Sequence, residues 1–150
     1  MKKKHVDAEY SQITSYIWIG TNQCCNFHFK KELLRQGIDA DISLEEERVD
    51  EPVGVHHFLW LPVKDHHALS QTQLHIGAAF METLVKSKIK MYVHCKNGHG
   101  RSPSLVMAYF ITQGKTYQQA FDLVKSKRPE VHLRPSQTAA LRKFAQRRKK

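Results

Sequence analysis

Residues 89–114 read IKMYVHCKNGHGRSPSLVMAYFITQG, and this stretch decides the fold. It opens with a short apolar alternation of the kind that forms a strand, at Ile89, Met91 and Val93. Gly98 and Gly100 follow, and glycines let a backbone turn sharply and come close to a ligand. The stretch therefore begins as a strand that runs into a tight loop.

A helix is predicted after this loop. Ser102 and Pro103 suit its first turn, where the missing N–H of proline has no partner to lose. A mostly apolar run continues from Leu105 to Ile111, and Gly114 suits the end of the helix. N–H groups from the loop and the helix N-terminus would converge on one point, where the helix dipole adds positive potential. The stretch therefore predicts an anion-binding site.

Cys95 and Arg101 lie at the two ends of the loop, with residues 96–100 between them. The thiolate is the nucleophilic form of cysteine, and helix N-termini and neighbouring cations favour it. Arg101 offers a planar fork that matches two oxygens of a phosphate. The same electrostatics would ionise Cys95, bind a phosphate dianion and stabilise charge on its oxygens. The alternative is a structural cysteine in a glycine-rich loop.

The stretch from His94 to Ser102, HCKNGHGRS, resembles the His-Cys-x5-Arg-Ser/Thr signature of the cysteine-dependent protein phosphatases. The short chain and the flanking sequence are most similar to the dual-specificity branch of that superfamily. Trp18-Ile19-Gly20 is similar to the end of the first strand in those domains. The similarity covers most of the chain, but only residues 94–102 are specific. It implies a protein-tyrosine-phosphatase-like fold and chemistry that needs no cofactor.

Length and composition indicate an ordinary globular domain. The chain has 150 residues, of which 41% are hydrophobic and 25% charged. We expect one catalytic domain over residues 1–150, with short basic termini at 1–8 and 146–150. No apolar run is long enough to cross a membrane, and no charged-then-apolar leader is present, so we expect no stable membrane insertion.

The cysteines are Cys24, Cys25 and Cys95. An odd count without regular spacing argues against a disulfide framework, and a working thiolate needs a reducing compartment. The expected location is therefore the cytoplasm. A disulfide between Cys95 and one of the other two under oxidation is a further hypothesis, since it would protect the thiol from higher oxidation states.

The formal net charge is +10, and much of it lies in basic runs near the two ends, at Lys2–Lys4, Arg142–Lys143 and Arg147–Lys150. Such runs are usually solvated termini, but they also suit contact with anionic lipid or RNA. The positive field favours the approach of acidic substrates of any kind.

The remaining periodicities alternate between strand and helix. Strands are predicted over residues 13–20, 38–44 and 55–61, the last ended by Pro62. In the first, Ile17 and Ile19 share one face while Tyr16 and Trp18 share the other. Residues 45–48, Glu-Glu-Glu-Arg, are expected to form an exposed charged turn.

Helices are predicted over residues 22–36, with Asn22 as a cap and Gly37 closing it, and over residues 71–87 after Ser70. A capping box at Thr116–Gln119 opens another helix, and Pro135 begins the last. This alternation predicts an α/β fold, with a central, mainly parallel twisted sheet of about four to five strands flanked by helices. The loop at 95–101 would lie at the carboxyl end of a strand, where such sheets bind ligands.

Transfer of a phosphoryl group to Cys95 leaves an oxyanion that needs a proton, and a carboxylic acid on a closing loop is the usual donor. Asp65 is the candidate, because it follows an apolar strand and lies 30 residues before Cys95. That placement resembles the general-acid loop of the family. Asp39 and Glu82 are poorer candidates, because they lie on predicted regular elements, and a surface carboxylate that caps a turn is the alternative for Asp65.

The resemblance also implies roles around the nucleophile. His94 would help to hold the loop and favour the thiolate, although a buried structural histidine fits the same position. Ser102 would donate a hydrogen bond to the departing thiolate in the second step. Phosphate contacts are expected from Lys96, Asn97, Gly98, His99, Gly100 and Arg101.

No step requires a metal. The pairs His56–His57 and His66–His67 bracket a strand and the acid loop, and Cys24-Cys25 lies near His28, but none has the spacing of a known metal motif. No metal ligand is therefore assigned.

The sequence thus predicts a protein phosphatase that hydrolyses phosphotyrosine and phosphoserine or phosphothreonine in phosphoproteins or phosphopeptides through a phosphocysteine intermediate. A phosphoinositide phosphatase and an RNA 5′-triphosphatase use the same kind of loop and remain alternatives. A phosphate-binding module without catalysis is a third, although Cys95, Arg101, Ser102 and Asp65 are all present.

Overall fold

The computed structural model describes residues 9–22 and 29–148, and in this part of the chain five strands form one sheet. The strand order is β1-β2-β5-β3-β4. The strands are β1 (Tyr10–Gln12), β2 (Ile17–Gly20), β3 (Ile38–Glu45), β4 (His57–Val63) and β5 (Lys90–His94). Only β1 runs antiparallel to its neighbour, so the prediction of a mainly parallel sheet of four to five strands is confirmed.

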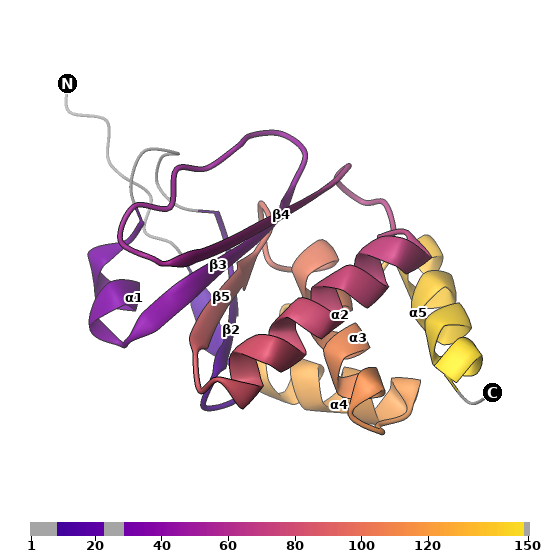
Figure 1. Ribbon diagram of the computed structural model, residues 1–150. Coiled ribbons are helices and arrows are strands. Elements are labelled where there is room, and N and C mark those ends of the chain that lie inside the picture. The colour runs from indigo at the N-terminus through magenta and orange to yellow at the C-terminus, as the bar shows by residue number, and fades with distance from the viewer. Residues whose placement is uncertain (1–8, 23–28, 149–150) are drawn as a thin grey trace.

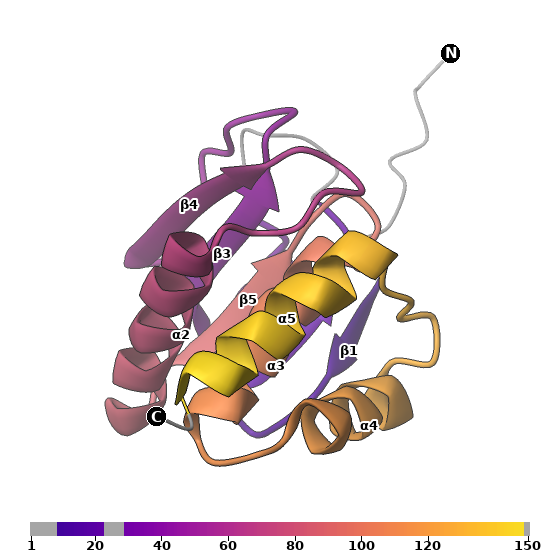
Figure 2. The same cartoon turned by 90° about the vertical axis from the view of Figure 1, so that its right-hand side faces the viewer.

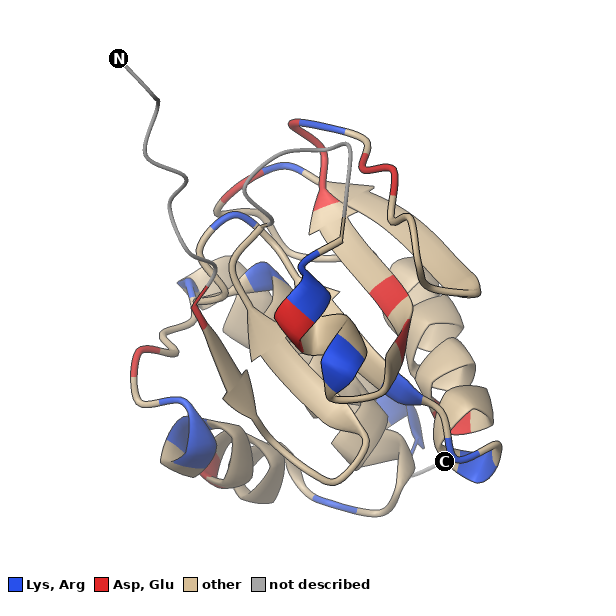
Figure 3. Cartoon of the chain, turned by 90° about the vertical axis from the view of Figure 1, so that its left-hand side faces the viewer, with Lys and Arg blue, Asp and Glu red and all other residues tan. Residues whose placement is uncertain are grey.

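Helices cover both faces of the sheet unequally. They are α1 (Lys31–Arg35), α2 (Gln71–Lys86), α3 (Arg101–Thr112), α4 (Tyr117–Lys127) and α5 (Pro135–Arg148). The four helices α2 to α5 pack on one face (Figures 1 and 2). The short charged helix α1 lies across the other face, seen from the front in Figure 3. The two faces bury separate apolar clusters, the larger of which lies under α2 to α5.

Strand β5 lies at the centre of the sheet, between β2 and β3. Met91 and Val93 point into the larger cluster and Tyr92 into the smaller one, and none of the three is exposed. Helix α3 follows after the loop at residues 95–100 and is buried from Arg101 to Ile111. The predicted strand, loop and helix therefore form the middle of the molecule.

Parallel strands place their carboxyl ends at one edge of a sheet. The segments after β2, β3, β4 and β5 therefore emerge together. These segments carry, respectively, Asn22, residues 46–56, Asp65 and Cys95. Chain positions far apart in sequence meet at this edge for this topological reason.

Two predicted boundaries at the N-terminal end were wrong. The predicted strand 13–20 is only the strand β2 preceded by a turn, in which the N–H of Ile13 donates to the carbonyl of Ile17, and β1 was missed. Tyr16 lies in that turn and packs on the larger cluster, away from the face of Trp18. Of the predicted helix 22–36, residues 23–28 lie outside the described part of the chain. In the described part, helix forms only in α1, because Lys30 is an extended N-cap.

Pro62 does not end β4, which continues to Val63. Proline cannot donate to a sheet ladder, but β4 is the edge strand of the order above, where that donor is not needed. The charged turn predicted at 45–48 was also wrong at its first residue. Glu45 is the last residue of β3 and is 1% exposed.

The later helices agree closely with their sequence signals. Ser70 with Gln73 and Thr116 with Gln119 form capping boxes at the starts of α2 and α4. Helix α3 begins one residue before Ser102, with Gly100 as its cap. No helix in the described part of the chain is both long and apolar enough to span a membrane.

Candidate active site

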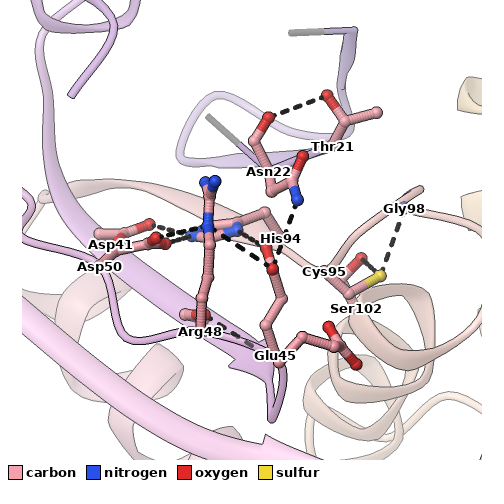
Figure 4. A network of polar contacts seen from close by, with 12 residues as sticks. Thr21, Asn22, Asp41, Glu45, Arg48, Asp50, His94, Cys95, Gly98 and Ser102 are labelled. Carbon is pink, nitrogen blue, oxygen red and sulfur yellow. Dashed lines mark hydrogen bonds and ion pairs between the residues drawn. The ribbon is translucent and has the colours of Figure 1, made fainter. Parts of the chain in front are cut away.

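Cys95 follows the last residue of β5 and is 3% exposed. Its Sγ accepts a hydrogen bond from the backbone N–H of Gly98 at 3.2 Å (Figure 4). The hydroxyl of Ser102, in the first turn of α3, lies 3.3 Å from the same sulfur. A backbone N–H and a hydroxyl therefore both lie against the sulfur, and both can stabilise it as a thiolate.

Arg128 shapes the loop from outside. Its Nε donates to the carbonyl of Gly98 at 2.9 Å, and its Nη2 donates to the carbonyl of Asn97 at 3.1 Å. In a trans peptide the C=O and the next N–H point in opposite directions. Holding the Asn97 carbonyl outward therefore directs the Gly98 N–H inward to the sulfur of Cys95.

Gly98 is required for this turn. Its φ is 68°, and a Cβ at this position would lie 2.8 Å from the carbonyl oxygen of Gly20 and 2.9 Å from Nη2 of Arg128. A side chain would thus meet both the backbone of β2 and the arginine that holds the loop.

Arg101 lies almost fully inside the protein, with 2% of its surface exposed. Its Nη1 donates to Glu47 Oε1 at 2.7 Å and to the carbonyl of Val63 at 2.8 Å. Among the described residues, its Nε and Nη2 have no hydrogen-bond partner. Burial by itself would lower the pKa of Arg101, but Glu47 and the charge of Cys95 raise it above its usual range. A permanent cation with two unused donors therefore lies beside the thiol.

Asp65 lies in the same pocket as Cys95 and Arg101. Its Oδ1 is 3.4 Å from Nη2 of Arg101, an ion pair without a hydrogen bond, and accepts a hydrogen bond from the N–H of His66 at 2.9 Å. His66 has a φ of 67°, and its Nδ1 lies 3.1 Å from Nη2 of Arg134. The carboxylate predicted as the general acid therefore lies next to Arg101, the residue predicted to bind phosphate.

The pocket is lined by ten residues: Asp65, His66, Cys95, Asn97, His99, Gly100, Arg101, His132, Arg134 and Gln137. Of the predicted phosphate contacts, Asn97, His99, Gly100 and Arg101 are among them. Lys96 is exposed and is not, and Gly98 is buried beneath the pocket against the thiol. The rings of His99 and His132 lie 5.2 Å apart, and burial together with His132 lowers the pKa of His99.

His94 is surrounded by acidic groups. Its Nε2 lies 2.8 Å from Asp41 Oδ1 and 3.4 Å from Asp50 Oδ2, and its Nδ1 lies 3.2 Å from Glu45 Oε1 (Figure 4). Burial by itself would lower the pKa of His94, but these carboxylates raise it to about 10. Arg48 lies 3.0 Å from Asp50 and 3.8 Å from Glu45, so the network holds a second cation.

Other predicted candidates lie elsewhere. Asp39 pairs with His56 at 2.6 Å, and Glu82 pairs with Lys86 along the exposed side of α2, so neither lines the pocket. Within the described residues, the only group of three metal-capable side chains is Asp41, Asp50 and His94, not the histidine pairs noted in the sequence. Cys24, Cys25, His28 and the predicted basic end at 1–8 lie outside the described residues.

Sequence reasoning missed the residues that support the site. Asp41 and Glu45 lie in the run IDADISLE, where acidic residues inside an apolar strand are a usable signal of a buried polar partner. Arg128, Glu47 and Asp50 carry no such signal, because only the fold brings them to the loop.

The relatives found by comparison with known proteins agree with one another. The model of the family described as "Dual specificity phosphatase, catalytic domain" matches residues 17–147. The human dual specificity protein phosphatase 5 is 34% identical over 56% of this chain and 23% of its own length. The phosphatidylglycerophosphate phosphatase PTPMT2 of Arabidopsis thaliana is 35% identical over 58% of this chain and 39% of its own length. The chain thus spans well under half the length of these two relatives.

A solved structure agrees with the fold. The crystal structure of a single-residue variant of human DUSP28 is 25% identical in sequence and superposes with a TM-score of 0.82, covering 93% of this chain and 96% of that one. The sheet, the helices on its faces and the loop at its edge are therefore those of a known architecture.

Proposed function

The chain belongs to the dual specificity phosphatase catalytic-domain family, and from that membership and the geometry of its loop we propose that it is a cysteine-dependent protein phosphatase. Its substrates are phosphotyrosine and phosphoserine or phosphothreonine in phosphoproteins or phosphopeptides. The observation that carries the proposal is the meeting of Cys95, Arg101 and Asp65 in one pocket, with two unused donors on the arginine.

In the first step, the thiolate of Cys95 attacks the phosphorus of the substrate. A sulfur–phosphorus bond forms while the bond from phosphorus to the substrate oxygen breaks. Asp65, in its protonated form, gives its proton to the leaving oxygen. Arg101 and the inward N–H groups of the loop hold the phosphoryl oxygens and stabilise their charge.

In the second step, a water molecule attacks the phosphocysteine. Asp65, now a carboxylate, takes a proton from this water, and phosphate leaves with the new oxygen. The sulfur departs with its bonding electrons, and the hydroxyl of Ser102, 3.3 Å away, donates a hydrogen bond to it. The enzyme returns to its starting state without a cofactor.

A lipid phosphomonoester is the second candidate substrate. The identity to a phosphatidylglycerophosphate phosphatase favours it, as does a pocket rim with Arg134 and three histidines, His66, His99 and His132. Lys96, the residue that suggested a phosphoinositide, is exposed outside the pocket lining. For this reason we rank lipid substrates below phosphoproteins.

RNA 5′-triphosphatase activity and anionic-lipid contact through the basic ends stay predictions that no relative among those described supports. The basic end at 1–8 lies outside the described residues, while Arg148 packs against Phe144 at the end of α5. We propose a cytoplasmic location only from the need of the thiolate for a reducing environment.

The test is phosphate release by the wild type, Cys95→Ser and Asp65→Ala proteins, with chelator present throughout. The substrates are p-nitrophenyl phosphate, phosphotyrosine and phosphothreonine peptides, phosphatidylinositol phosphates, phosphatidylglycerophosphate and triphosphate-ended RNA. We expect the highest kcat/KM on phosphopeptides, no turnover by Cys95→Ser and a strong loss in Asp65→Ala. Exclusive turnover of a lipid or of RNA would replace the proposed substrate, and binding without turnover in the wild type would leave only a phosphate-binding module.

A further inference from the structure

Three carboxylates surround one imidazole directly before the nucleophile. The side chains of His94, Asp41, Glu45 and Asp50 are all buried, with at most 4% of any of them exposed. Both ring nitrogens of His94 face carboxylate oxygens: Nε2 faces Asp41 and Asp50, and Nδ1 faces Glu45 (Figure 4).

This geometry selects one protonation state of His94. A neutral imidazole carries one N–H and one lone pair. Either neutral tautomer would therefore aim a lone pair at a buried anion, which is costly where solvent does not screen it. Only the imidazolium carries an N–H on both ring nitrogens: Nδ1 can then donate to Glu45, while Nε2 is ion-paired with Asp41 and Asp50 without a hydrogen bond. The raised pKa of His94, about 10, agrees with this state.

The other charged and titratable neighbours fit the same state. Arg48 pairs with Asp50 and Glu45, two of the carboxylates that also face the imidazole. Tyr92, from the same strand, stacks on the imidazole with ring centroids 5.4 Å apart. Burial raises the pKa of Asp50, and the opposing effects of His94 and Arg48 do not offset it. Of the two carboxylates that face Nε2, the fully buried Asp41 is the closer, at 2.8 Å, and Asp50 is the more distant, at 3.4 Å.

His94 is well placed to transmit this restraint to the loop. As the last residue of β5, it is in register with Gly20 of β2 and Ser43 of β3, and Cys95 follows it directly. Asp41 belongs to β3 and Asp50 to the segment after it. The ion pairs with Asp41 and Asp50 therefore link the end of β5 to β3 and to the segment that follows β3. This is the point where Cys95 leaves the sheet.

We propose that Asp41 and Asp50 are positioning residues for the phosphatase reaction: together with Glu45 they clamp His94 as an imidazolium and so fix the turn from which Cys95 attacks. The inference rests on the proposed phosphatase activity. None of the three carboxylates lines the substrate pocket, so they act through His94.

The first test is steady-state kinetics of Asp41→Asn with p-nitrophenyl phosphate. Because small displacements of reacting groups are costly, we expect kcat to fall between about tenfold and about a hundredfold. KM should change by less than about twofold, since the phosphate contacts are untouched. The matched control is Asp39→Asn, which removes an exposed carboxylate on the same strand that also pairs with histidines. An unchanged kcat in Asp41→Asn, or an equal loss in Asp39→Asn, overturns the proposal.

The second test asks whether Asp41 acts through His94. In a double-mutant cycle, Asp41→Asn should have little further effect on kcat in a His94→Gln background. A loss in that background as large as in the wild type means that Asp41 acts independently of the histidine, and the proposal fails. Thermal unfolding of each variant identifies any that do not fold.

Asp50→Asn replaces Asp41→Asn if the latter does not fold. Because the pKa of Asp50 is raised, a neutral isostere is the milder change there. Its Oδ2 lies 3.4 Å from Nε2, against 2.8 Å for Asp41, so we expect a smaller loss of kcat. A rise in KM without a fall in kcat would contradict a positioning role.

The third test does not depend on activity. In nitrogen-15 NMR spectra, the ring of His94 should stay doubly protonated at pH 8 in the wild type and lose its proton at lower pH in Asp41→Asn. A neutral ring in the wild type at pH 8 refutes the clamp even if the enzyme is active. A wild type that is inactive but shows the imidazolium refutes only the proposed function. Ring signals that move on adding Zn²⁺ and return with EDTA would show that a metal ion, which these ligands could hold, takes the place of the proton and would overturn the clamp.

Discussion

The sulfur of Cys95 receives one N–H from its own loop and lies beside one hydroxyl from α3. These two contacts have different consequences. The N–H of Gly98 is fixed by the backbone and acts whenever the thiolate is present. The hydroxyl of Ser102 rotates and is most useful when the sulfur departs, because a hydrogen bond to a charged group is stronger than one to a neutral group.

Ser102→Ala should therefore slow the breakdown of phosphocysteine more than its formation. A hydrogen bond to a charged group is worth about 1.5–3 kcal/mol, so kcat should fall between about tenfold and about a hundredfold. Pre-steady-state release of p-nitrophenol should show a burst in the variant. The control is Ser104→Ala, because in the wild type the hydroxyl of Ser104 donates to the Gly100 carbonyl, four residues before it, and not to the sulfur. A variant without a burst and with normal kcat would remove Ser102 from the mechanism.

The second prediction for a single residue concerns Arg128. Arg128→Lys keeps the charge but cannot span the carbonyls of Asn97 and Gly98 together with the hydroxyl of Ser11. We expect kcat/KM for p-nitrophenyl phosphate to fall by at least about tenfold, because the N–H of Gly98 loses the contact that directs it inward. Lys127→Ala, at the exposed neighbouring position, is the control. Full activity in Arg128→Lys would mean that the loop holds its shape without this arginine.

Prediction of single residues succeeded where the chemistry is local in sequence. The spacing of Cys95 and Arg101 predicts that one loop brings them together, and the structure places both in one pocket with Asp65. Their catalytic roles stay proposals. Arg128, Glu47 and Asp50 were not predictable, since each comes from another segment to contact the loop, Arg101 or His94, and has an ordinary sequence context.

At the scale of elements, the site depends on the close packing of α2 against α3. Gly77 lies in the middle of α2, and a Cβ there would lie 2.3 Å from Cδ1 of the buried Leu105 in α3. Helix α3 carries Arg101 and Ser102 in its first turn. The position of the proposed phosphate site therefore depends on how closely these two helices approach.

Gly77→Ala should destabilise the protein although alanine favours helices by about 1 kcal/mol over glycine. Overpacking a buried contact typically costs about 1–3 kcal/mol, and Leu105 is fully buried, so it cannot move aside into solvent. Urea unfolding followed by circular dichroism measures the balance. An increase in the free energy of unfolding would show that α2 and α3 separate at little cost.

The element boundaries that failed had physical causes outside the local sequence. Pro62 remains in β4 because that strand is at the edge of the sheet, and edge position depends on topology. Glu45 is buried because His94 lies beside it, at 3.2 Å between Nδ1 and Oε1. Capping boxes, by contrast, are local, and those of α2 and α4 were confirmed at Ser70 and Thr116.

For the whole molecule, the buried charges make stability depend on pH. The pKa of His94 is raised from its ordinary 6.5 to about 10, so its contribution is complete below pH 6.5 and is lost as the pH rises toward 10. Burial alone would raise the pKa of Glu45, but His94 and Arg48 lower it. The contribution of Glu45 is therefore present above its ordinary pKa of 4.5 and is lost as the pH falls through the lowered value.

We therefore expect the free energy of unfolding to decrease between pH 6.5 and pH 10 by an amount on the order of a few kcal/mol. Urea titrations at several pH values measure it. Asp41→Asn should flatten this slope, because the folded pKa of His94 moves toward its ordinary value. A wild-type curve that is level up to pH 10 would contradict the buried imidazolium.

Anion binding should also stabilise the whole fold. At a phosphate concentration of about 100 times its Kd, binding adds about 2.7 kcal/mol to the free energy of unfolding, which raises Tm by several degrees. We expect this shift in the wild type and its loss in Arg101→Ala, with sodium chloride at equal ionic strength as the control. An equal shift in Arg101→Ala would place the anion elsewhere.

The central claim is that Cys95 carries the phosphoryl group during turnover. The most direct measurement is acid quenching of the wild type and Asp65→Ala during p-nitrophenyl phosphate hydrolysis, followed by mass spectrometry of the peptide that contains Cys95. We expect a phosphoryl group on Cys95 in both, with more in Asp65→Ala because it lacks the base for the second step. Continued turnover with this peptide unmodified, or with the phosphoryl group on another residue, would contradict the account.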